Sequence, residues 1–519
     1  VTVALAFLTP LAPVSAGPDV SFTGSGWGHG VGLSQYGAKA MGADGASWRE
    51  IIDRYYTGVA VGSLGMVAPE SFVNTDPDPL WVGLLQDSES VTFSVETGTA
   101  RLCFDVENYC SAIATTGETW RFGPDTPDSC AFQRVIGQGV TLLISRSASC
   151  AASVRPDSAS VVIALPFKAR SYDNGAIRFR KAVAPRKFHT AIEMGIDDYM
   201  KGLAVVPESW AAASLEAQAV AVRSNALWHA LDRGAEGTFG ATQQAACSCN
   251  LYDASPDQVF QGYTGEIRHP NWVAAVDATA MQVMGWGATV ALGEFTSSSG
   301  GWTENYSDVF GGTAHSYLAS VNDSAAYADS AANPHQSWGA GSDQASLASE
   351  FAFAWVSYVE VVSRNTSGSA ATVQLTGIRN GRPESETVSA VAVRAALSLR
   401  STTFNVTVTP RFTDVPPTHQ FAGEVLGLDV LGITSGCTTA TFCPTGRVTR
   451  GEMATFLVRA LDLVPGGAVD SFSDDDGSFF EADIEALLAA GVTTGCSATT
   501  FCPDREVTRG EMAAFLVRG

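Results

Sequence analysis

The chain has 519 residues, a formal net charge of −22 and an isoelectric point near 4.6. Its length allows several domains. The strong acidity argues against nucleic acid or an anionic membrane as partner. After the apolar N-terminus, no run approaches the roughly 18–20 apolar residues of a membrane helix. We therefore expect no nucleic-acid partner and no transmembrane helix.

The chain starts with an apolar segment. Val14 and Ala16 suit the −3 and −1 positions of a signal-peptide cleavage site. A positively charged start is missing and the first residue is Val. We therefore expect a signal peptide over 1–16 with a truncated start or a non-ATG start codon, and an exposed N-terminal strand is the alternative.

The sequence GSGWGHGVGLSQYGAKA at 24–40 surrounds one histidine with glycines. Gly26, Gly28 and Gly30 permit a positive φ or a close backbone approach. The following ASWREIIDRYYTG predicts a helix packed by Ile51, Ile52 and Tyr55. A purely structural turn is the alternative interpretation of the loop. We assign 17–60 to this segment and the turn-rich 61–79 to a linker.

Residues 80–408 predict one large α+β domain. From LWVGLLQDSESVTFSVETG onward, apolar and polar residues alternate as in strands. A helical zone follows at about 195–232, where an Ala-rich segment favours helix. A polar, cysteine-containing stretch at about 100–155 predicts a disulfide-stapled β insertion.

Ten cysteines support export, because even, local groups of cysteines suit disulfides in an oxidising compartment. Four lie in the predicted insertion with their pairing open, and two further pairs bracket short loops. Cys247 and Cys249 resist this interpretation, because cysteines two residues apart close a strained ring; metal ligation is their alternative. The insertion contains Cys103, Cys110, Cys130 and Cys150, and the bracketing pairs are Cys437 with Cys443 and Cys496 with Cys502.

The C-terminus contains an internal repeat over 410–463 and 470–519. Each unit predicts a helix, a turn, a cysteine-bracketed loop and a second helix. Thr449 and Thr508 are expected N-caps, with Glu452 and Glu511 as their capping-box partners. The fold class is therefore α+β, followed by helical repeats.

The segment YMKGLAVVPESWAAASLEAQAVAVRSNALWHA at 199–230 resembles the core of the SpoIID/LytB family. Four further stretches match in the family's order over about 80–408: CSCNLYDASPDQVFQGYTGE, FTSSSGGWTENYSDVFGGTAHSYLASV, NPHQSW and LSLRSTTF. GWGHGVGLSQYGA resembles a block that ends the domain in many relatives. Here it comes first, as if the order were permuted, so we expect it to fold back onto the domain.

This resemblance implies a bacterial protein that acts on peptidoglycan glycan strands as a lytic transglycosylase, or that enhances a wall amidase. The family uses one glutamate as acid and then base, and it leaves a 1,6-anhydromuramyl end. An ungapped alignment puts Val205 at that position. Valine cannot transfer a proton, so the candidate catalytic residue is Glu208, three positions later. The alternatives are a catalytically inactive domain, or another acid among Glu193, Glu294 and Glu304.

Other residues are expected to bind the glycan. His29 could hydrogen-bond a sugar or orient an acid, and the residues after it suit sugar hydroxyls and ring stacking. Some relatives carry a Cys/His set that suggests zinc, but Asn250 stands where the His would be, so we expect no metal and no cofactor. The expected substrate-binding set is His29, Gln35, Tyr36, Gln218, Arg223, Ser298, Ser299 and Thr303.

The C-terminal units resemble S-layer homology repeats in FTDV, GIT, FCP and VTRGEM. In that family the arginine of a Thr-Arg-Ala-Glu motif contacts an acidic wall polysaccharide. The motif here is TRGE twice, so Arg450 and Arg509 are the expected contacts with a secondary cell-wall polysaccharide. The family usually has three repeats and this chain has two, so self-sufficient anchoring does not follow.

Together these features predict a secreted protein of the cell wall or cell surface. It is expected to bind and, as an enzyme, to cleave peptidoglycan glycan strands while the repeats anchor it. The first alternative is an inactive glycan-binding protein or a modulator of a wall amidase. The second is a structural surface-layer component.

Overall fold

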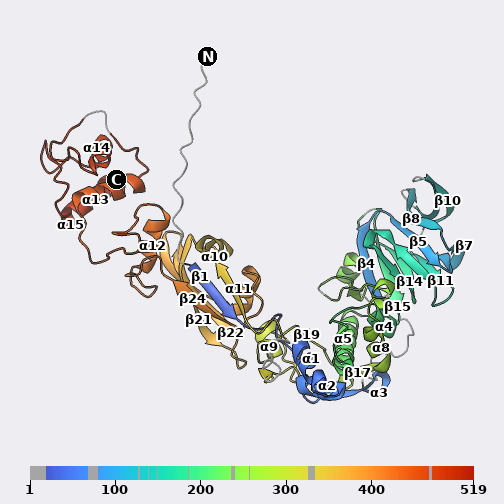
Figure 1. Cartoon of the computed structure of the whole chain (residues 1–519). Helices are drawn as coiled ribbons and strands as arrows, with labels where there is room; N and C mark the ends of the chain where they lie inside the picture. Colours follow the sequence, from blue (N-terminus) through green and yellow to red (C-terminus); the bar gives the residue numbers. More distant parts are fainter. Residues whose placement is uncertain are drawn as a thin grey trace. The chain divides into compact units, whose positions relative to one another are not determined.

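The computed structural model describes residues 19–67, 80–126, 129–137, 140–148, 150–184, 186–234, 240–255, 257–324, 333–466 and 470–519. The predicted signal peptide and residues 68–79 of the predicted linker lie outside these ranges. Among the described residues, no helix is long and apolar enough to cross a membrane. Helices and strands are mixed (Figure 1), so the α+β class is confirmed.

The chain forms two compact units. One contains residues 25–336, and the other joins the N-terminal residues up to Gly24 to residues 337–519. The chain therefore crosses between the units twice, after Gly24 and after Gln336. The first crossing falls in the predicted 17–60 segment and the second in the predicted 80–408 domain.

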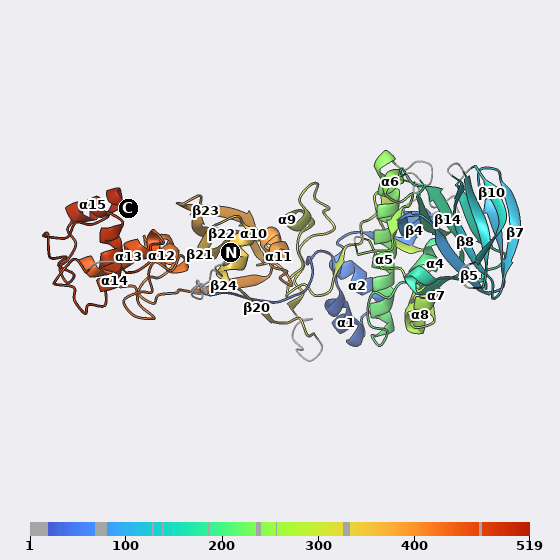
Figure 2. The same ribbon diagram turned by 90° about the horizontal axis from the view of Figure 1, so that it is seen from above.

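Two sheets lie together in the 25–336 unit (Figure 2). Buried side chains from both sheets form one apolar core. Phe122 stacks on Phe179 with ring centroids 4.4 Å apart, and Phe104 meets Phe132 at 5.3 Å, so rings of both sheets interlock. The seven-stranded sheet has the order β16 (Leu251–Tyr252), β4 (Leu80–Ser88), β15 (Phe188–Met194), β14 (Gly175–Lys181), β11 (Ala152–Pro156), β6 (Thr99–Phe104) and β7 (Tyr109–Thr115). The six-stranded sheet has the order β10 (Val140–Ser147), β9 (Ser129–Ile136), β8 (Thr119–Thr126), β5 (Val91–Thr97), β12 (Val162–Leu165) and β13 (Arg170–Tyr172).

Two disulfides lie in the region of the predicted insertion. Cys103 in β6 pairs with Cys110 in β7, and Cys130 in β9 pairs with Cys150, two residues before β11. The pairing that the sequence left open is therefore between consecutive cysteines.

A helical layer surrounds α5 (Ala212–Arg233), whose residues are buried on most sides, as its small alanines allow. Ile51, Ile52 and Tyr55 of α2 (Trp48–Tyr55) are buried, which confirms the predicted packing of that helix. Its Ser47–Glu50 capping box sets its start. The other helices of this unit are α1 (Gln35–Ala43), α3 (Leu64–Val67), η2 (Pro166–Lys168), α4 (Ile196–Lys201), α6 (Ala241–Ala246), α7 (Tyr263–Glu266), α8 (Pro270–Ala278) and α9 (Tyr306–Phe310).

Short strands complete this unit. β3 (Ala60–Ser63) overlaps the start of the predicted linker and pairs with β17 (Gln282–Trp286), which also pairs with β18 (Thr289–Val290). β2 (Leu33–Ser34) runs parallel to β19 (Phe295–Thr296).

In the other unit, β1 (Asp19–Gly24) lies between β20 (Trp338–Ser342) and β24 (Phe404–Thr409). Phe22 of β1 is buried against Phe404, with ring centroids 5.4 Å apart. A second sheet contains β21 (Trp355–Arg364), β22 (Ala370–Arg379) and β23 (Arg382–Ser389), accompanied by α10 (Gln344–Glu350) and α11 (Ala390–Ala396).

The repeat region of this unit carries α12 (Ala422–Val430), α13 (Arg450–Ala460), α14 (Glu481–Ala489) and α15 (Arg509–Arg518). Thr449 and Thr508 cap α13 and α15, and Glu452 and Glu511 complete both capping boxes, which confirms that prediction. The two bracketed loops are closed by disulfides between Cys437 and Cys443 and between Cys496 and Cys502.

Candidate functional site

The glycine loop, residues 25–32, lies against residues 294–304. Trp27 pairs with Ser298 in an isolated bridge, and Val31 pairs with Glu304. The β2–β19 pair continues the same contact. The expectation that this segment folds back onto residues of the predicted 80–408 range is therefore confirmed.

The glycines of this loop are required by backbone shape and space. Gly28 has a φ of +115°, and a Cβ there would lie 2.2 Å from Oγ1 of Thr296. Gly30 has a φ of +83°, and its Cβ would lie 2.7 Å from Cγ of Glu304. The Thr296 hydroxyl accepts the Gly30 N–H at 3.1 Å and donates to the Trp27 carbonyl at 3.1 Å, which fixes the loop.

His29 projects from this loop toward Glu294. The N–H of Val31 donates to Nδ1 of His29 at 3.1 Å, so Nε2 is the nitrogen directed at the carboxyl. Nε2 lies 3.6 Å from Oε2 of Glu294. The His29 ring also meets Phe310 of α9 at 5.2 Å between centroids, so one side of the imidazole is apolar.

Glu294 is a largely buried carboxyl beside the loop. Its side chain is 18% exposed, and burial raises its pKa to about 7. The Glu294 carbonyl accepts the N–H of Leu33 and the hydroxyl of Tyr56, at 3.0 and 2.6 Å, so its backbone is fixed. A carboxyl that is partly neutral near pH 7 can serve as a general acid.

A row of aromatic rings lies beside the loop: Trp27, His335, Tyr36 and Trp210, here called the aromatic row. Successive ring centroids are 4.7, 5.2 and 5.3 Å apart. Trp27 is 47% exposed, and the other three are half-buried. Nζ of Lys39 lies 5.4 Å from the Tyr36 ring and 5.7 Å from the Trp210 ring. Gln35, the first residue of α1, is half-buried next to Tyr36 in sequence.

The carboxyl of the predicted acid Glu208 accepts a hydrogen bond at the N-terminus of α8. Its Oε1 accepts the N–H of Asn271 in the first turn of α8 at 2.8 Å, and its Oε2 lies 3.4 Å from Nδ1 of His269. Residues 205–208 form no helical turn, so Val205 and Glu208 do not share a helix face. These contacts favour a structural role for Glu208.

Two predicted binding residues of α5 are buried. Arg223 is fully enclosed, and its guanidinium donates to Asp197 at 2.7 Å and to the carbonyls of Gln282 and Val276. It therefore ties α5 to its neighbours. Gln218 is also buried, and its side-chain amide has no hydrogen-bond partner among the described residues.

The predicted polar loop residues Ser298, Ser299 and Thr303 are buried as well. Ser299 donates to Asp323 at 2.6 Å, and Asp323 also accepts the Tyr55 hydroxyl at 2.7 Å. The Thr303 hydroxyl accepts the N–H of Val321, and the Asn333 amide donates to Ser298. These buried hydrogen bonds fix the 294–304 segment on which the glycine loop packs.

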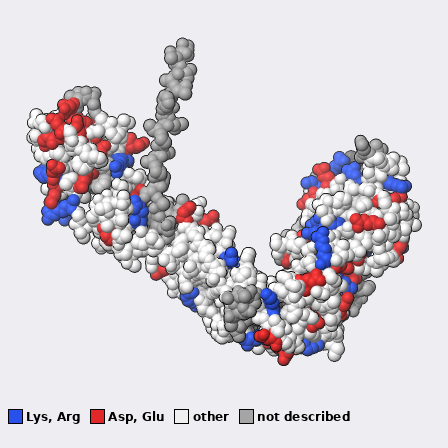
Figure 3. Space-filling model, in the orientation of Figure 1, with Lys and Arg blue, Asp and Glu red and all other residues white. Residues whose placement is uncertain are grey.

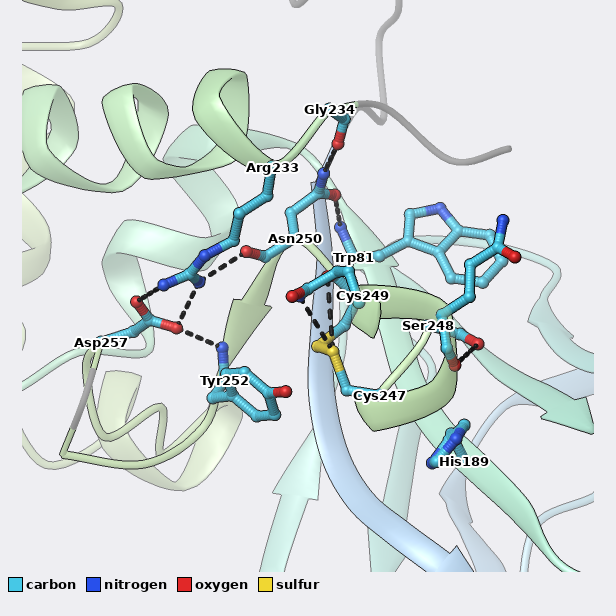
Figure 4. The surroundings of a disulfide bond; sticks show 12 residues. Trp81, His189, Arg233, Gly234, Cys247, Ser248, Cys249, Asn250, Tyr252 and Asp257 are labelled. Carbon is cyan, nitrogen blue, oxygen red and sulfur yellow. Dashed lines mark hydrogen bonds and ion pairs between the residues drawn. A yellow bond between two sulfur atoms is a disulfide. The ribbon is translucent and has the colours of Figure 1, made fainter. Parts of the chain in front are cut away.

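Cys247 and Cys249 form a disulfide, so the sequence-based interpretation against one is wrong (Figure 4). Ser248 between them has a φ of +49°, and this left-handed turn allows the ring to close. Asn250, where some relatives have a His, is buried; its amide donates to the Gly234 carbonyl and accepts the N–H of Trp81. Arg233 donates to the Asn250 carbonyl and to Asp257. The two sulfurs are therefore used in a structural link.

The two arginines of the repeats differ. Arg450 is 3% exposed, donates to the Phe501 carbonyl at 2.7 Å and to Glu511 at 3.0 Å, and lies over the Phe501 ring. Arg509 is exposed at the first position of α15. Of the two predicted wall contacts, only Arg509 presents its side chain to solvent.

The architecture defines a mixed helix–strand unit joined to a pair of capped-helix repeats. Residues 185–286 match the family model described as Stage II sporulation protein (SpoIID), and residues 411–454 and 471–513 match the S-layer homology (SLH) domain. The chain therefore carries a SpoIID domain and two SLH repeats, as the sequence resemblance indicated. The SpoIID match contains Val205, Glu208 and the Cys247–Cys249 disulfide, and it ends before Glu294.

Curated proteins show the same two similarities. The chain is 47% identical over 45 residues to Stage II sporulation protein D of Bacillus amyloliquefaciens, covering 9% of this chain and 13% of that protein. It is 36% identical over 88 residues to the surface-layer 125 kDa protein of Lysinibacillus sphaericus, covering 17% and 7%. It is 32% identical over 107 residues to an endoglucanase of Bacillus sp. (strain KSM-635), covering 21% and 11%. Each match therefore spans a small part of the relative. The SLH repeats and surface-layer relatives indicate a cell-surface or cell-wall location.

Proposed function

We propose that the 25–336 unit binds peptidoglycan glycan strands, while the SLH repeats hold the protein on a secondary cell-wall polysaccharide. The aromatic row carries this proposal, because the apolar face of a sugar ring stacks on an aromatic ring and its hydroxyls meet the polar edges nearby. A strand without peptide stems exposes the lactyl carboxylates of its muramyl sugars. Lys39 beside Tyr36 and Trp210 provides a cation for such a carboxylate.

The binding proposal is tested with purified, stem-peptide-free glycan strands in a titration followed by tryptophan fluorescence. Tyr36→Ala and Trp210→Ala are each expected to weaken binding about tenfold, since a stacked ring contributes roughly 1–1.5 kcal/mol. The matched control is Phe167→Ala, because Phe167 is a 41% exposed aromatic side chain in η2 of the same unit. Equal affinity for all variants, or no binding by the wild type, would refute the proposal.

The raised pKa of Glu294 and its contact with His29 favour a second function, lytic transglycosylase activity with Glu294 as the acid. The Glu294 carboxyl would give its proton to the glycosidic oxygen as the C1–O bond breaks. The oxygen of the muramyl 6-hydroxyl would attack C1, and its proton would return to the Glu294 carboxylate. One carboxyl therefore suffices, because the attack is intramolecular. His29, directed at Glu294, would orient that carboxyl.

Mass spectrometry of digested strands tests this activity through 1,6-anhydromuramyl ends. Wild type, Glu294→Gln, Glu208→Gln and Val205→Glu are compared. Products from wild type and Glu208→Gln but not from Glu294→Gln would support Glu294, whereas loss only in Glu208→Gln would support the sequence-based prediction. Binding without products supports an inactive glycan-binding protein, for which a wall amidase stays the predicted partner. Neither binding nor products would favour a structural surface-layer component.

A further inference from the structure

The two SLH repeats have aligned sequences and equivalent hydrogen bonds, but they differ at one pair of buried positions. Asp414 accepts the N–H groups of Phe442 and Cys443, and Asp474 accepts those of Phe501 and Cys502. The next residue is Val415 in the first repeat and Asp475 in the second.

The partner position differs in the same way. Leu426 is the fifth residue of α12, and Glu485 is the fifth residue of α14. Val415 and Leu426 line one apolar pocket in the first repeat. The second repeat therefore replaces an apolar contact with two buried acidic side chains.

These acidic side chains converge. One carboxylate oxygen each of Asp470, Asp475 and Glu485 lies within 4.8 Å of the other two. Asp475 is 0% exposed, and neither of its carboxylate oxygens has a hydrogen-bond partner among the described residues. Glu485 accepts the N–H of Ser471 at 2.9 Å, which fixes its direction.

Such a cluster is unfavourable without a cation. Asp475 and Glu485 are both enclosed and their carboxylate oxygens lie within 4.8 Å of each other, so two ionised groups repel each other and lack hydration in this site. The second repeat, residues 470–519, has ten acidic and three basic residues, against five and four in the first, residues 410–463. Figure 3 shows acidic side chains gathered on the repeat region. The surroundings therefore attract cations.

We propose that Asp470, Asp475 and Glu485 bind a calcium ion in the second SLH repeat. Calcium takes hard oxygen ligands in flexible geometry and completes its shell with carbonyls and water, so three converging carboxylates suit it. A weak site of an extracellular module has a Kd of about 10⁻⁴–10⁻³ M. The ion links the segment before Phe472, the turn after it and α14. It therefore rigidifies the repeat that carries Arg509.

Calorimetric titration of the full chain with CaCl2, after EDTA treatment, tests the site. The decisive variant is Asp475→Val with Glu485→Leu, which copies the Val415 and Leu426 pair of the first repeat and is therefore expected to fold. Wild type should bind calcium with a Kd near 1 mM or below, and this double variant should lose that binding at least tenfold. Asp476→Asn, one residue away and exposed, is the matched control and should keep it.

Hydrogen exchange locates the ion independently of the heat. Calcium should slow exchange in peptides covering 470–489 of wild type and of Asp476→Asn, and not in the double variant. If the double variant does not fold, Asp475→Asn gives the same comparison. Equal calcium binding and equal protection in wild type and the double variant would overturn the proposal, as would the absence of both in wild type at 10 mM calcium, about ten times the upper Kd.

Discussion

Nε2 of His29 lies 3.6 Å from Oε2 of Glu294. The imidazole comes from the glycine loop, and the carboxyl comes from the residue before β19, so the contact exists only because the two segments pair. Neither residue lies in the range that matches the SpoIID model. The strongest candidate for acid chemistry is therefore outside the segment that contains Val205 and Glu208.

Glu294 makes stability depend on pH. Its pKa in the folded protein is about 7, above its usual value of 4.5, so the folded state holds this proton more tightly than the unfolded state. The stabilisation is complete below pH 4.5 and is lost as the pH rises through about 7. Between pH 5 and pH 8 in urea unfolding, the wild type should lose about 2.5 kcal/mol more unfolding free energy than Glu294→Gln. Identical pH dependence would contradict the raised pKa.

The glycine loop should tolerate no side chain at Gly28. Gly28→Ala combines a φ of +115° with a contact of 2.2 Å to the Thr296 hydroxyl, so we expect a loss of about 2–4 kcal/mol in unfolding free energy. Gly45→Ala is the control, because Gly45 has a φ of +93° with no atom within 4 Å of the added Cβ. Its loss should be about 1 kcal/mol. Chemical denaturation of both variants separates steric contact from backbone strain.

Glu208 should matter for α8 more than for chemistry. Glu208→Ala removes the acceptor of the Asn271 N–H, and we expect a loss of about 1 kcal/mol, typical of a helix cap. Glu208→Gln keeps an acceptor oxygen and should lose less than half of that. A thermal melt followed by circular dichroism measures both. Equal losses in the two variants would show that the charge, and not the hydrogen bond, is what counts.

The repeat arginines should separate stability from wall binding. Arg450→Ala leaves the Phe501 carbonyl without its buried donor, so we expect about 2–3 kcal/mol of destabilisation. Arg509→Ala should change stability by no more than about 0.5 kcal/mol, because its side chain is exposed. In sedimentation with purified cell walls, Arg509→Ala should bind more weakly than wild type. Undiminished sedimentation would remove Arg509 as a wall contact.

Features set by neighbours in sequence could be predicted. The capping boxes of α13 and α15, the packing of α2 and the positive φ values of the glycine loop depend on residues a few positions apart. The disulfide between Cys247 and Cys249 was missed because it depends on the left-handed backbone of Ser248, a residue type that rarely adopts it.

Features set by tertiary burial could not be predicted in the same way. The pKa of Glu294 reflects its enclosure, and no local pattern distinguishes it from Glu193 or Glu304. Arg223 and Arg450 are polar residues in segments with ligand-binding resemblance, yet packing encloses both. The aromatic row joins rings from the glycine loop, α1, the segment before α5 and residue 335, and only folding brings them together.

The position of β1 has a consequence for release from the wall. The chain enters the 25–336 unit after Gly24 and leaves it after Gln336. That unit is therefore inserted between β1 and its neighbouring strand β20. A cut beside Gly24 leaves the 25–336 unit covalently attached to residues 337–519. A cut after Gln336 leaves it attached to β1, which keeps its backbone hydrogen bonds to β20 and β24. Shedding of the 25–336 unit therefore requires a cut after Gln336 together with either a second cut beside Gly24 or the dissociation of β1 from its two neighbouring strands.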